Sequence, residues 1–230
     1  MAARVNRRPY DSTGRQARAR ENRTVILATA RELFLEHGYS SATMAAIAAE
    51  AGVSVETIYK VFGNKPGLLR ALFDVAVGDD DQVIPNLDRE VLDQLWAEPD
   101  PEKKLRLYGE ILGRGAARVQ PVQLLARQAA ASDPAAAEVY ETIRNERLAG
   151  MTGFAGFLND SGRLRDDVTV EEARDVLWTY NSAELWELLV VKRGWQPERY
   201  GRWIGDALVA ALLDDPPRQS TRRPRPRAAS

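Results

Sequence analysis

The side chains with the clearest chemical role lie in residues 43–65, TMAAIAAEAGVSVETIYKVFGNK. Thr43 and Ser54 belong to the residue types that cap helix N-termini, because their hydroxyl oxygen accepts from an otherwise unpaired backbone N–H. Gly52, between them, can take the positive φ that ends a first short helix. Two short helices joined by a tight turn form a helix-turn-helix, whose second helix fits the major groove of DNA. The stretch therefore predicts DNA recognition.

The second helix, expected from residue 55 onward, would bring its first turn nearest to the base edges. Glu56 has two interpretations: it could accept from cytosine N4, or it could only favour a helix N-terminus. Ile58 and Phe62 lie four residues apart and are expected to pack inward. Thr43 could serve as both a cap and a phosphate donor. The candidate contacts of the second helix are Ser54, Val55, Glu56, Thr57 and Lys60.

Helices must position this motif, because the short alternating runs typical of strands are nearly absent. Apolar spacing of three to four residues predicts a long first helix that ends before Gly38. A capping residue followed by proline predicts three later helix starts, at Asp100, Asp133 and Gln196. Besides the two short helices, we expect helices at residues 18–37, 66–77, 87–97, 101–119, 122–131, 134–158, 170–193 and 197–213.

With these flanking helices in order, the sequence resembles the DNA-binding domain of the tetracycline-repressor (TetR-like) family of bacterial regulators. The resemblance covers about residues 20–80. It implies an all-α fold, with an N-terminal three-helix DNA-binding domain and a C-terminal helical domain for ligand binding and dimerisation. It also implies base or phosphate contacts for Thr57, Tyr59 and Lys65. The matching features are His37-Gly38-Tyr39, the T-x-x-x-I-A-x-x-A-G-V-S pattern of residues 43–54, Thr57, Tyr59, Phe62, and the Lys65 and Leu68 pair.

Charge is unevenly distributed, although the whole chain has a formal net charge of -1. Residues 1–66 carry +4, residues 67–215 carry -10, and residues 216–230 carry +5. This division suggests one part that meets a polyanion and one that does not, although arginine could merely solubilise both ends. Arg23 and its neighbours could contact phosphates. We expect a disordered basic arm (1–17), a DNA-binding domain (18–66), an effector-binding and dimerisation domain (67–215) and a disordered basic tail (216–230).

Paired DNA half-sites require two copies of the motif, so we expect a dimer. The last two helices are its expected interface, because they carry apolar faces. The alternative is that their apolar faces only close the single chain. The predicted interface residues are Trp186, Gly201, Gly205, Leu208 and Leu212.

An apolar cavity in the body is expected to bind a small effector. The resemblance implies a small, often hydrophobic molecule, whose identity the sequence does not indicate. The predicted lining residues are Trp96, Tyr108, Tyr140, Phe154, Phe157, Trp178, Tyr180 and Asn181.

The residue types that are missing narrow the alternatives. The chain has no cysteine and one histidine, which excludes disulfide scaffolds, cysteine-ligated zinc and thiol nucleophiles. We expect no catalytic residue, metal or cofactor, and a cytoplasmic protein, since no apolar run approaches the ~20 residues of a membrane span. The resemblance implies a dimeric repressor that a small hydrophobic effector releases from a palindromic operator. The alternatives are a helical ligand-binding protein or enzyme with a vestigial helix-turn-helix, and an architectural DNA binder.

Overall fold

The computed structural model describes residues 12–78 and 86–214, and every regular element in these ranges is a helix. The fold class is therefore all-α, as predicted. Within these ranges, no helix combines the length and the apolar character that a membrane span requires. The predicted basic tail, from residue 216 onward, and residues 1–11 of the predicted arm lie outside the described residues.

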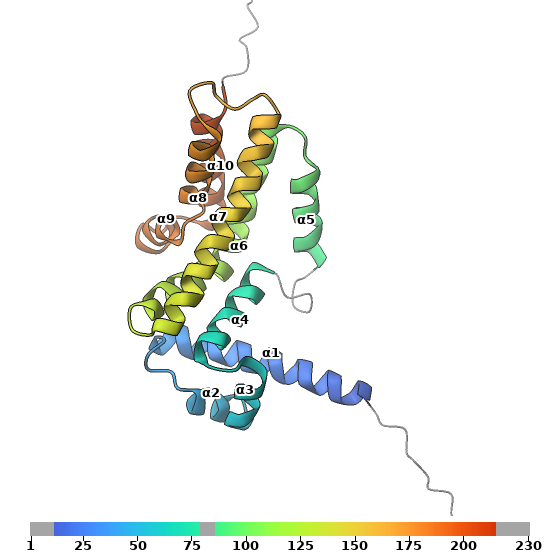
Figure 1. The fold of residues 1–230 in the computed structure, drawn as a ribbon, viewed down its shortest axis with the longest axis vertical. Coiled ribbons are helices and arrows are strands. Elements are labelled where there is room, and N and C mark those ends of the chain that lie inside the picture. Colours follow the sequence, from blue (N-terminus) through green and yellow to red (C-terminus); the bar gives the residue numbers. More distant parts are fainter. Residues whose placement is uncertain (1–11, 79–85, 215–230) are drawn as a thin grey trace, which may run out of the picture.

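Four helices form one end of the molecule (Figure 1). The first begins at residue 12 rather than at residue 18, so residues 12–17 belong to a helix and not to a disordered arm. Alanine, glutamine and arginine in this segment all favour helix, and no proline interrupts it. The helices of this end, which we call the head, are α1 (Ser12–His37), α2 (Met44–Glu50), α3 (Val55–Phe62) and α4 (Lys65–Val77).

The remaining helices form the body, in which the two longest extend away from the head (Figure 1). Side-chain caps start several of them: Asp100 and Asp133 each precede a proline, and Thr169 forms a capping box with Glu172. The body consists of α5 (Asn86–Ala97), α6 (Pro101–Ala130), α7 (Pro134–Asp160), α8 (Val170–Tyr180), α9 (Ala183–Trp186), the π-helix η1 (Glu187–Lys192) and α10 (Pro197–Leu212).

Two helix predictions in the body are wrong. α6 continues through Pro121, where we expected two helices. Proline leaves the carbonyl four residues earlier without its helical partner, and this carbonyl of Ala117 accepts from Arg31 of α1 at 3.4 Å. The helix expected over residues 170–193 breaks after Tyr180 and ends as a π-helix. At Pro121, a contact with a distant part of the chain thus accompanies the departure from the prediction.

The buried apolar residues form two cores, and the first is shared between head and body. It joins α1–α4 to the ends of α6 and α7 that lie beside α1 (Figure 1). Val122 and Ala126 of α6 and Ile143 of α7 belong to it, each at most 1% exposed. The second core joins the rest of α6 and α7 to α5, α8, α9 and α10. The head is therefore packed onto the body by common side chains.

Glycine allows α6 and α10 to approach closely. Gly109 and Gly113 of α6 face Gly201 and Gly205 of α10. A Cβ atom at Gly109 would lie 2.5 Å from both the carbonyl oxygen of Gly201 and the backbone nitrogen of Gly205. Only residues without a side chain fit this contact.

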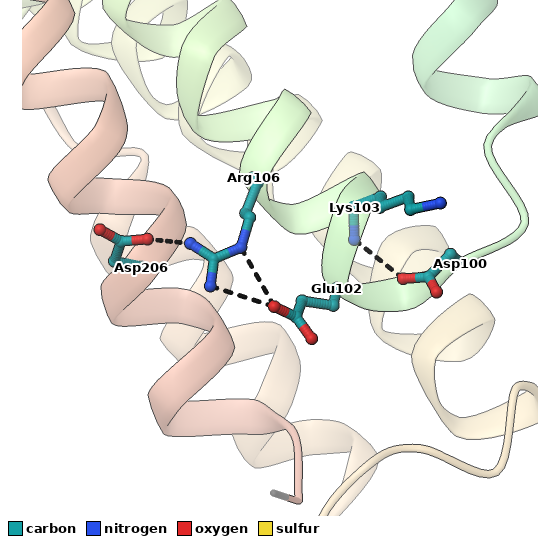
Figure 2. A network of polar contacts seen from close by, with 5 residues as sticks. All are labelled: Asp100, Glu102, Lys103, Arg106 and Asp206. Carbon is teal, nitrogen blue, oxygen red and sulfur yellow. Dashed lines mark hydrogen bonds and ion pairs between the residues drawn. The ribbon is translucent and has the colours of Figure 1, made fainter. Parts of the chain in front are cut away.

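An ion-pair network borders this close contact (Figure 2). Arg106 on α6 pairs with Asp206 on α10, and also with Glu102 one turn earlier at 3.1 Å. Asp100 accepts from the backbone N–H of Lys103 at 3.0 Å and so caps the start of α6. The network fixes the two helices in register without reaching the cavity described below.

The residues predicted for a dimer interface are buried within the single chain. Leu208 and Leu212 have no exposed surface, Trp186 is 9% exposed, and Gly201 and Gly205 contact α6. The small residues of α10 thus allow a close approach to α6 of the same chain, and not the predicted contact with a second copy. A buried side chain has no area to offer a second copy in this arrangement.

Candidate DNA-binding surface and ligand cavity

Side-chain caps and one turn build the helix-turn-helix. Thr43 Oγ1 accepts from the backbone N–H of Ala46 at 3.1 Å, which starts α2. Ser54 Oγ accepts from the backbone N–H of Thr57 at 3.2 Å, which starts α3. Gly52, between the helices, has a φ of 66° that L side chains rarely adopt. Both short helices therefore lie where the sequence predicts them.

α3 divides its side chains between the core and the solvent. Ile58 is fully buried and Phe62 is 9% exposed. On the other side, Tyr59 is 49% exposed, and Glu56 and Lys60 also face solvent. This exposed face carries phenol, carboxylate and ammonium groups, which are the kinds of group that contact phosphates and base edges.

Other predicted DNA contacts have partners within the chain. The ammonium of Lys65 lies 4.3 Å from the ring centroid of Tyr39, and burial lowers its pKa. The guanidinium of Arg23 lies 5.2 Å from the ring centroid of Phe62. Val55 is half-buried against the first core, and Thr57 Oγ1 lies 3.0 Å from Ser54 Oγ. The contacts of these residues with DNA stay predictions.

Glu56 is an exposed anion at the start of α3. Hydrogen bonds from its own backbone N–H and from the Ser54 hydroxyl lower the pKa of its carboxyl group. An ionised carboxylate stabilises the helix dipole here and repels a phosphate. The DNA group from which it could accept is therefore a base-edge donor such as cytosine N4.

Polar contacts join the head to the turn between α6 and α7. The phenol of Tyr39 donates to Asp133 Oδ2 at 2.7 Å, and burial raises the pKa of this phenol. The same Asp133 accepts from the backbone N–H groups of Ala135 and Ala136, so it also caps α7. Arg70 of α4 pairs with Glu146 of α7 at 2.7 Å. The angle between head and body is thus held by directional bonds as well as by the shared core.

A cavity of about 310 Å³ lies in the body. Its walls come from α4, α5, α6 and α7 and from the residue that follows α8. The apolar part of the lining includes Phe73, Val77, Leu92, Ile111, Leu112, Val119 and Met151. The polar part is Arg114, Arg118, Gln120, Gln123, Arg147 and Asn181.

Of the eight residues predicted to line a cavity, Tyr108 and Asn181 do so. The other six pack elsewhere, for identifiable reasons. Trp96 and Phe157 surround the buried ammonium of Lys104, which lies 3.8 Å from the Phe157 ring centroid. The remaining four of these residues pack against side chains of other residues. Phe154 packs against Tyr108 and Tyr180 against Trp203, while Tyr140 and Trp178 both lie beside the guanidinium of Arg144.

Apart from Asn181, the polar residues of the cavity were not among the predicted lining residues. Arg147 lies four residues after Ile143 and four before Met151, on the apolar side of α7. Gln120 and Gln123 share a side of α6 with Ala116 and are buried. The available signal was a polar residue inside an apolar stripe, which the search for aromatic residues overlooked.

Comparison with known proteins agrees with the helix-turn-helix. Residues 26–72 match the family model described as "Bacterial regulatory proteins, tetR family". A segment of 57 residues is 42% identical to the HTH-type transcriptional regulator UidR of Escherichia coli strain K12. That match covers 25% of this chain and 29% of UidR, so the likeness to this curated relative is confined to under a third of its length.

Solved structures share the fold over most of the chain. NalD, the secondary repressor of the MexAB-OprM efflux pump of Pseudomonas aeruginosa, matches with a TM-score of 0.67 at 20% identity, over 86% of this chain and 99% of that one. FadR of Bacillus subtilis, solved in complex with stearoyl-CoA, matches with a TM-score of 0.64 at 23% identity. This match covers 81% of this chain and 97% of FadR. At these identities the likeness shows the fold.

Proposed function

We propose that this chain is a sequence-specific DNA-binding repressor of transcription, because residues 26–72 match the family model of the tetR family of bacterial regulatory proteins. The observation that carries the proposal is the division of α3, which buries Ile58 and leaves Tyr59, Lys60 and Glu56 facing solvent. α3 enters the major groove, and the Tyr59 phenol donates to a phosphate. Such a regulator works in the cytoplasm, where bacterial DNA lies.

Two copies bind a palindromic operator, because one α3 reads only a few base pairs. Among the exposed apolar side chains of the described residues, Leu188 (51% exposed) and Val191 (57% exposed) lie together on η1, and they are the surface that we assign to a second copy. Leu188→Glu together with Val191→Glu should convert dimers to monomers in light scattering. A stable dimer of this double variant would show that another surface joins the copies.

A small effector bound in the body cavity releases the operator. Proteins of this fold have been solved with stearoyl-CoA (FadR of Bacillus subtilis) and with triclosan (SmeT). In this chain, Phe73 and Val77 of α4 line the cavity, and α4 starts directly after α3. An effector shifts the head only as far as it binds the released arrangement more tightly than the DNA-bound one.

Electrophoretic retention of DNA from the chain's own promoter region tests the DNA-binding proposal. Tyr59→Ala should weaken specific binding by about tenfold, because it removes one phosphate contact, and should leave the melting temperature unchanged. Arg165→Gln is the control, since Arg165 pairs with Asp167 in a body loop. Equal retention of unrelated DNA would favour an architectural binder. The absence of retention on any selected sequence would favour a ligand-binding protein or enzyme with a vestigial motif.

A further inference from the structure

We propose that the body cavity binds an organic carboxylate with an apolar body, and that the carboxylate pairs with the guanidinium of Arg147. The inference rests on the proposed function, in which this cavity is the effector site, and it names the chemical class of the effector. Its basis is a half-buried cation whose hydrogen-bond partners among the described residues are neutral carbonyl groups, in a cavity lined by both apolar and polar side chains.

Arg147 has hydrogen-bond capacity left over. Its Nη2 donates to the carbonyl oxygens of Trp178 at 3.1 Å and of Asn181 at 2.6 Å. Its Nε is buried and has no hydrogen-bond partner among the described residues. A buried guanidinium nitrogen without an acceptor is unfavourable, and a carboxylate in the cavity that Arg147 lines would bring a negative charge to the same guanidinium.

The charge of Arg147 is also uncompensated at close range. Glu184 is the carboxylate whose charge acts on it, and Glu184 is already bound to Arg127 at 2.8 Å. Burial lowers the pKa of Arg147, and the nearby charge of Arg144 lowers it further. The carbonyl oxygens of Trp178 and Asn181 offset part of the positive charge through their dipoles, but they do not neutralise it.

The rest of the polar lining favours an anion as well. Arg114 and Arg118 also line the cavity, and none of its described lining residues is Asp or Glu. Gln120 is 2% exposed, and its Oε1 has no partner in the described part of the chain. Because an amide can both donate and accept, Gln120 could hold a carboxylate oxygen or the polar group beside it.

The apolar lining selects among anions. Phe73, Ile111, Leu112 and Met151 would be in contact with most of the ligand's surface, which suits a hydrocarbon or aryl body and not a sugar or a nucleotide. A carboxylate is planar and matches the fork of a guanidinium. A volume of about 310 Å³ is at the small end of ligand cavities, so the body is short. A quaternary ammonium ligand would meet three arginines and is disfavoured.

Calorimetric titration of the full chain with decanoate tests the inference. Methyl decanoate and decyltrimethylammonium are the matched neutral and cationic probes. We expect decanoate to bind at least about tenfold more tightly than either, because an ionised pair with a guanidinium is absent from both alternatives. The inference is overturned if decanoate does not bind at about 1 mM, or if the ester binds equally well.

Two variants separate a ligand contact from a structural role. Arg147→Gln removes the positive charge. Gln120→Glu adds a negative charge that repels the carboxylate of the ligand, while Arg147 keeps its contacts to Trp178 and Asn181. Both should weaken decanoate binding by about tenfold or more and leave binding of methyl decanoate within about twofold. The control is Arg144→Gln, on the same helix but outside the cavity lining. Unchanged decanoate affinity in Gln120→Glu would count against the inference even if Arg147→Gln fails to fold.

DNA retention measured in parallel distinguishes the two proposals. Selective decanoate binding without retention of any DNA would support the inference and overturn the proposed function. Retention of promoter DNA without selective decanoate binding would do the opposite.

Discussion

The exposed face of α3 and the body cavity hold their polar groups in opposite environments. On α3, Tyr59 and Lys60 stand in water, while the buried side of the same helix is fully apolar. In the cavity, Gln120 and Arg147 have buried polar atoms that lack partners among the described residues. Water satisfies the first set before any ligand arrives, whereas a ligand in the cavity would bring new polar partners close to the second set.

The two environments predict different consequences of mutation. A change on the exposed face of α3 should affect binding and leave stability alone. A change in the body should affect both, because its side chains and close contacts also hold helices together. Five predictions test this contrast.

The largest effect is expected inside the body, at Gly109. Gly109→Ala would place a Cβ 2.5 Å from two backbone atoms of α10, so the helices must separate, at a cost of about 3 kcal/mol. Thermal unfolding followed by circular dichroism measures the loss. Gly115→Ala is the control, because a Cβ at Gly115 meets nothing within 4 Å. Equal melting temperatures for the two variants would show that the α6–α10 contact tolerates a wider spacing.

The next largest effect tests the two faces of α3 against each other. Ile58→Ala removes a fully buried side chain and should lower the free energy of unfolding by about 3 kcal/mol. Val61→Ala, on the same helix, changes a side chain that is 41% exposed and should cost less than about 0.5 kcal/mol. Chemical denaturation gives both values. If they were equal, the division of α3 into a core face and a solvent face would fail.

The hydrogen bond between the head and the turn that joins α6 and α7 should contribute less to the free energy of unfolding. Tyr39→Phe deletes the phenol that donates to Asp133 and should cost about 1 kcal/mol. Tyr140→Phe, which removes a phenol without a described hydrogen bond, is the control. Denaturation midpoints at pH 7 compare the two variants, and a loss as large in Tyr140→Phe would show that the bond to Asp133 adds nothing.

The same variant predicts a pH effect with a definite sign. Hydrogen bonding from Tyr39 lowers the pKa of Asp133 below its ordinary value of 3.8. The stability from this group is therefore complete above pH 3.8 and is lost as the pH falls through the lower value in the folded chain. Melting temperatures between pH 5 and pH 2 should fall less steeply in Tyr39→Phe than in the parent chain. Parallel curves would assign the acid sensitivity to other carboxyl groups.

An effect similar in size to that of Tyr39→Phe is expected at Ser54, where a helix cap and a predicted DNA contact coincide. Ser54→Ala removes the acceptor for the Thr57 N–H and should destabilise the head by about 1 kcal/mol. Ser54→Asp keeps an acceptor but adds a negative charge, so it should retain stability and lose DNA affinity. Hydrogen exchange of α3 and DNA retention separate the two effects. Normal DNA affinity in Ser54→Asp would show that residue 54 is remote from phosphates.

Local signals were sufficient to predict the helix-turn-helix of the head and insufficient for the body. Thr43, Gly52 and Ser54 each act on their immediate neighbours, so short-range rules located α2 and α3 correctly. The passage of α6 through Pro121 depends on Arg31, which lies far away in the sequence and binds the carbonyl of Ala117. The break after α8 likewise coincides with donation from Arg147. Periodicity does not contain such partners.

The sequence predicted a cavity in the body, but most of the residues predicted to line it lie elsewhere. The aromatic residues of the body can also pack outside a cavity. Trp96 and Phe157 contact the ammonium of Lys104, and Tyr180 packs against Trp203. What marks the observed cavity is Arg147 on an apolar helix face. A charged residue at a core position indicates a ligand site more specifically than a large apolar residue does, because a buried charge needs compensation and a buried aromatic ring does not.

The core that α1–α4 share with α6 and α7 limits how this molecule can be recombined. A chimera cut after residue 66, which would combine this head with a foreign body, separates Ile26 and Phe34 from the α6 and α7 residues of the same core. Both new fragments would then expose apolar surface that neither replacement is shaped to cover. A chimera that folds must therefore take the turn between α6 and α7 from the same parent protein as the head.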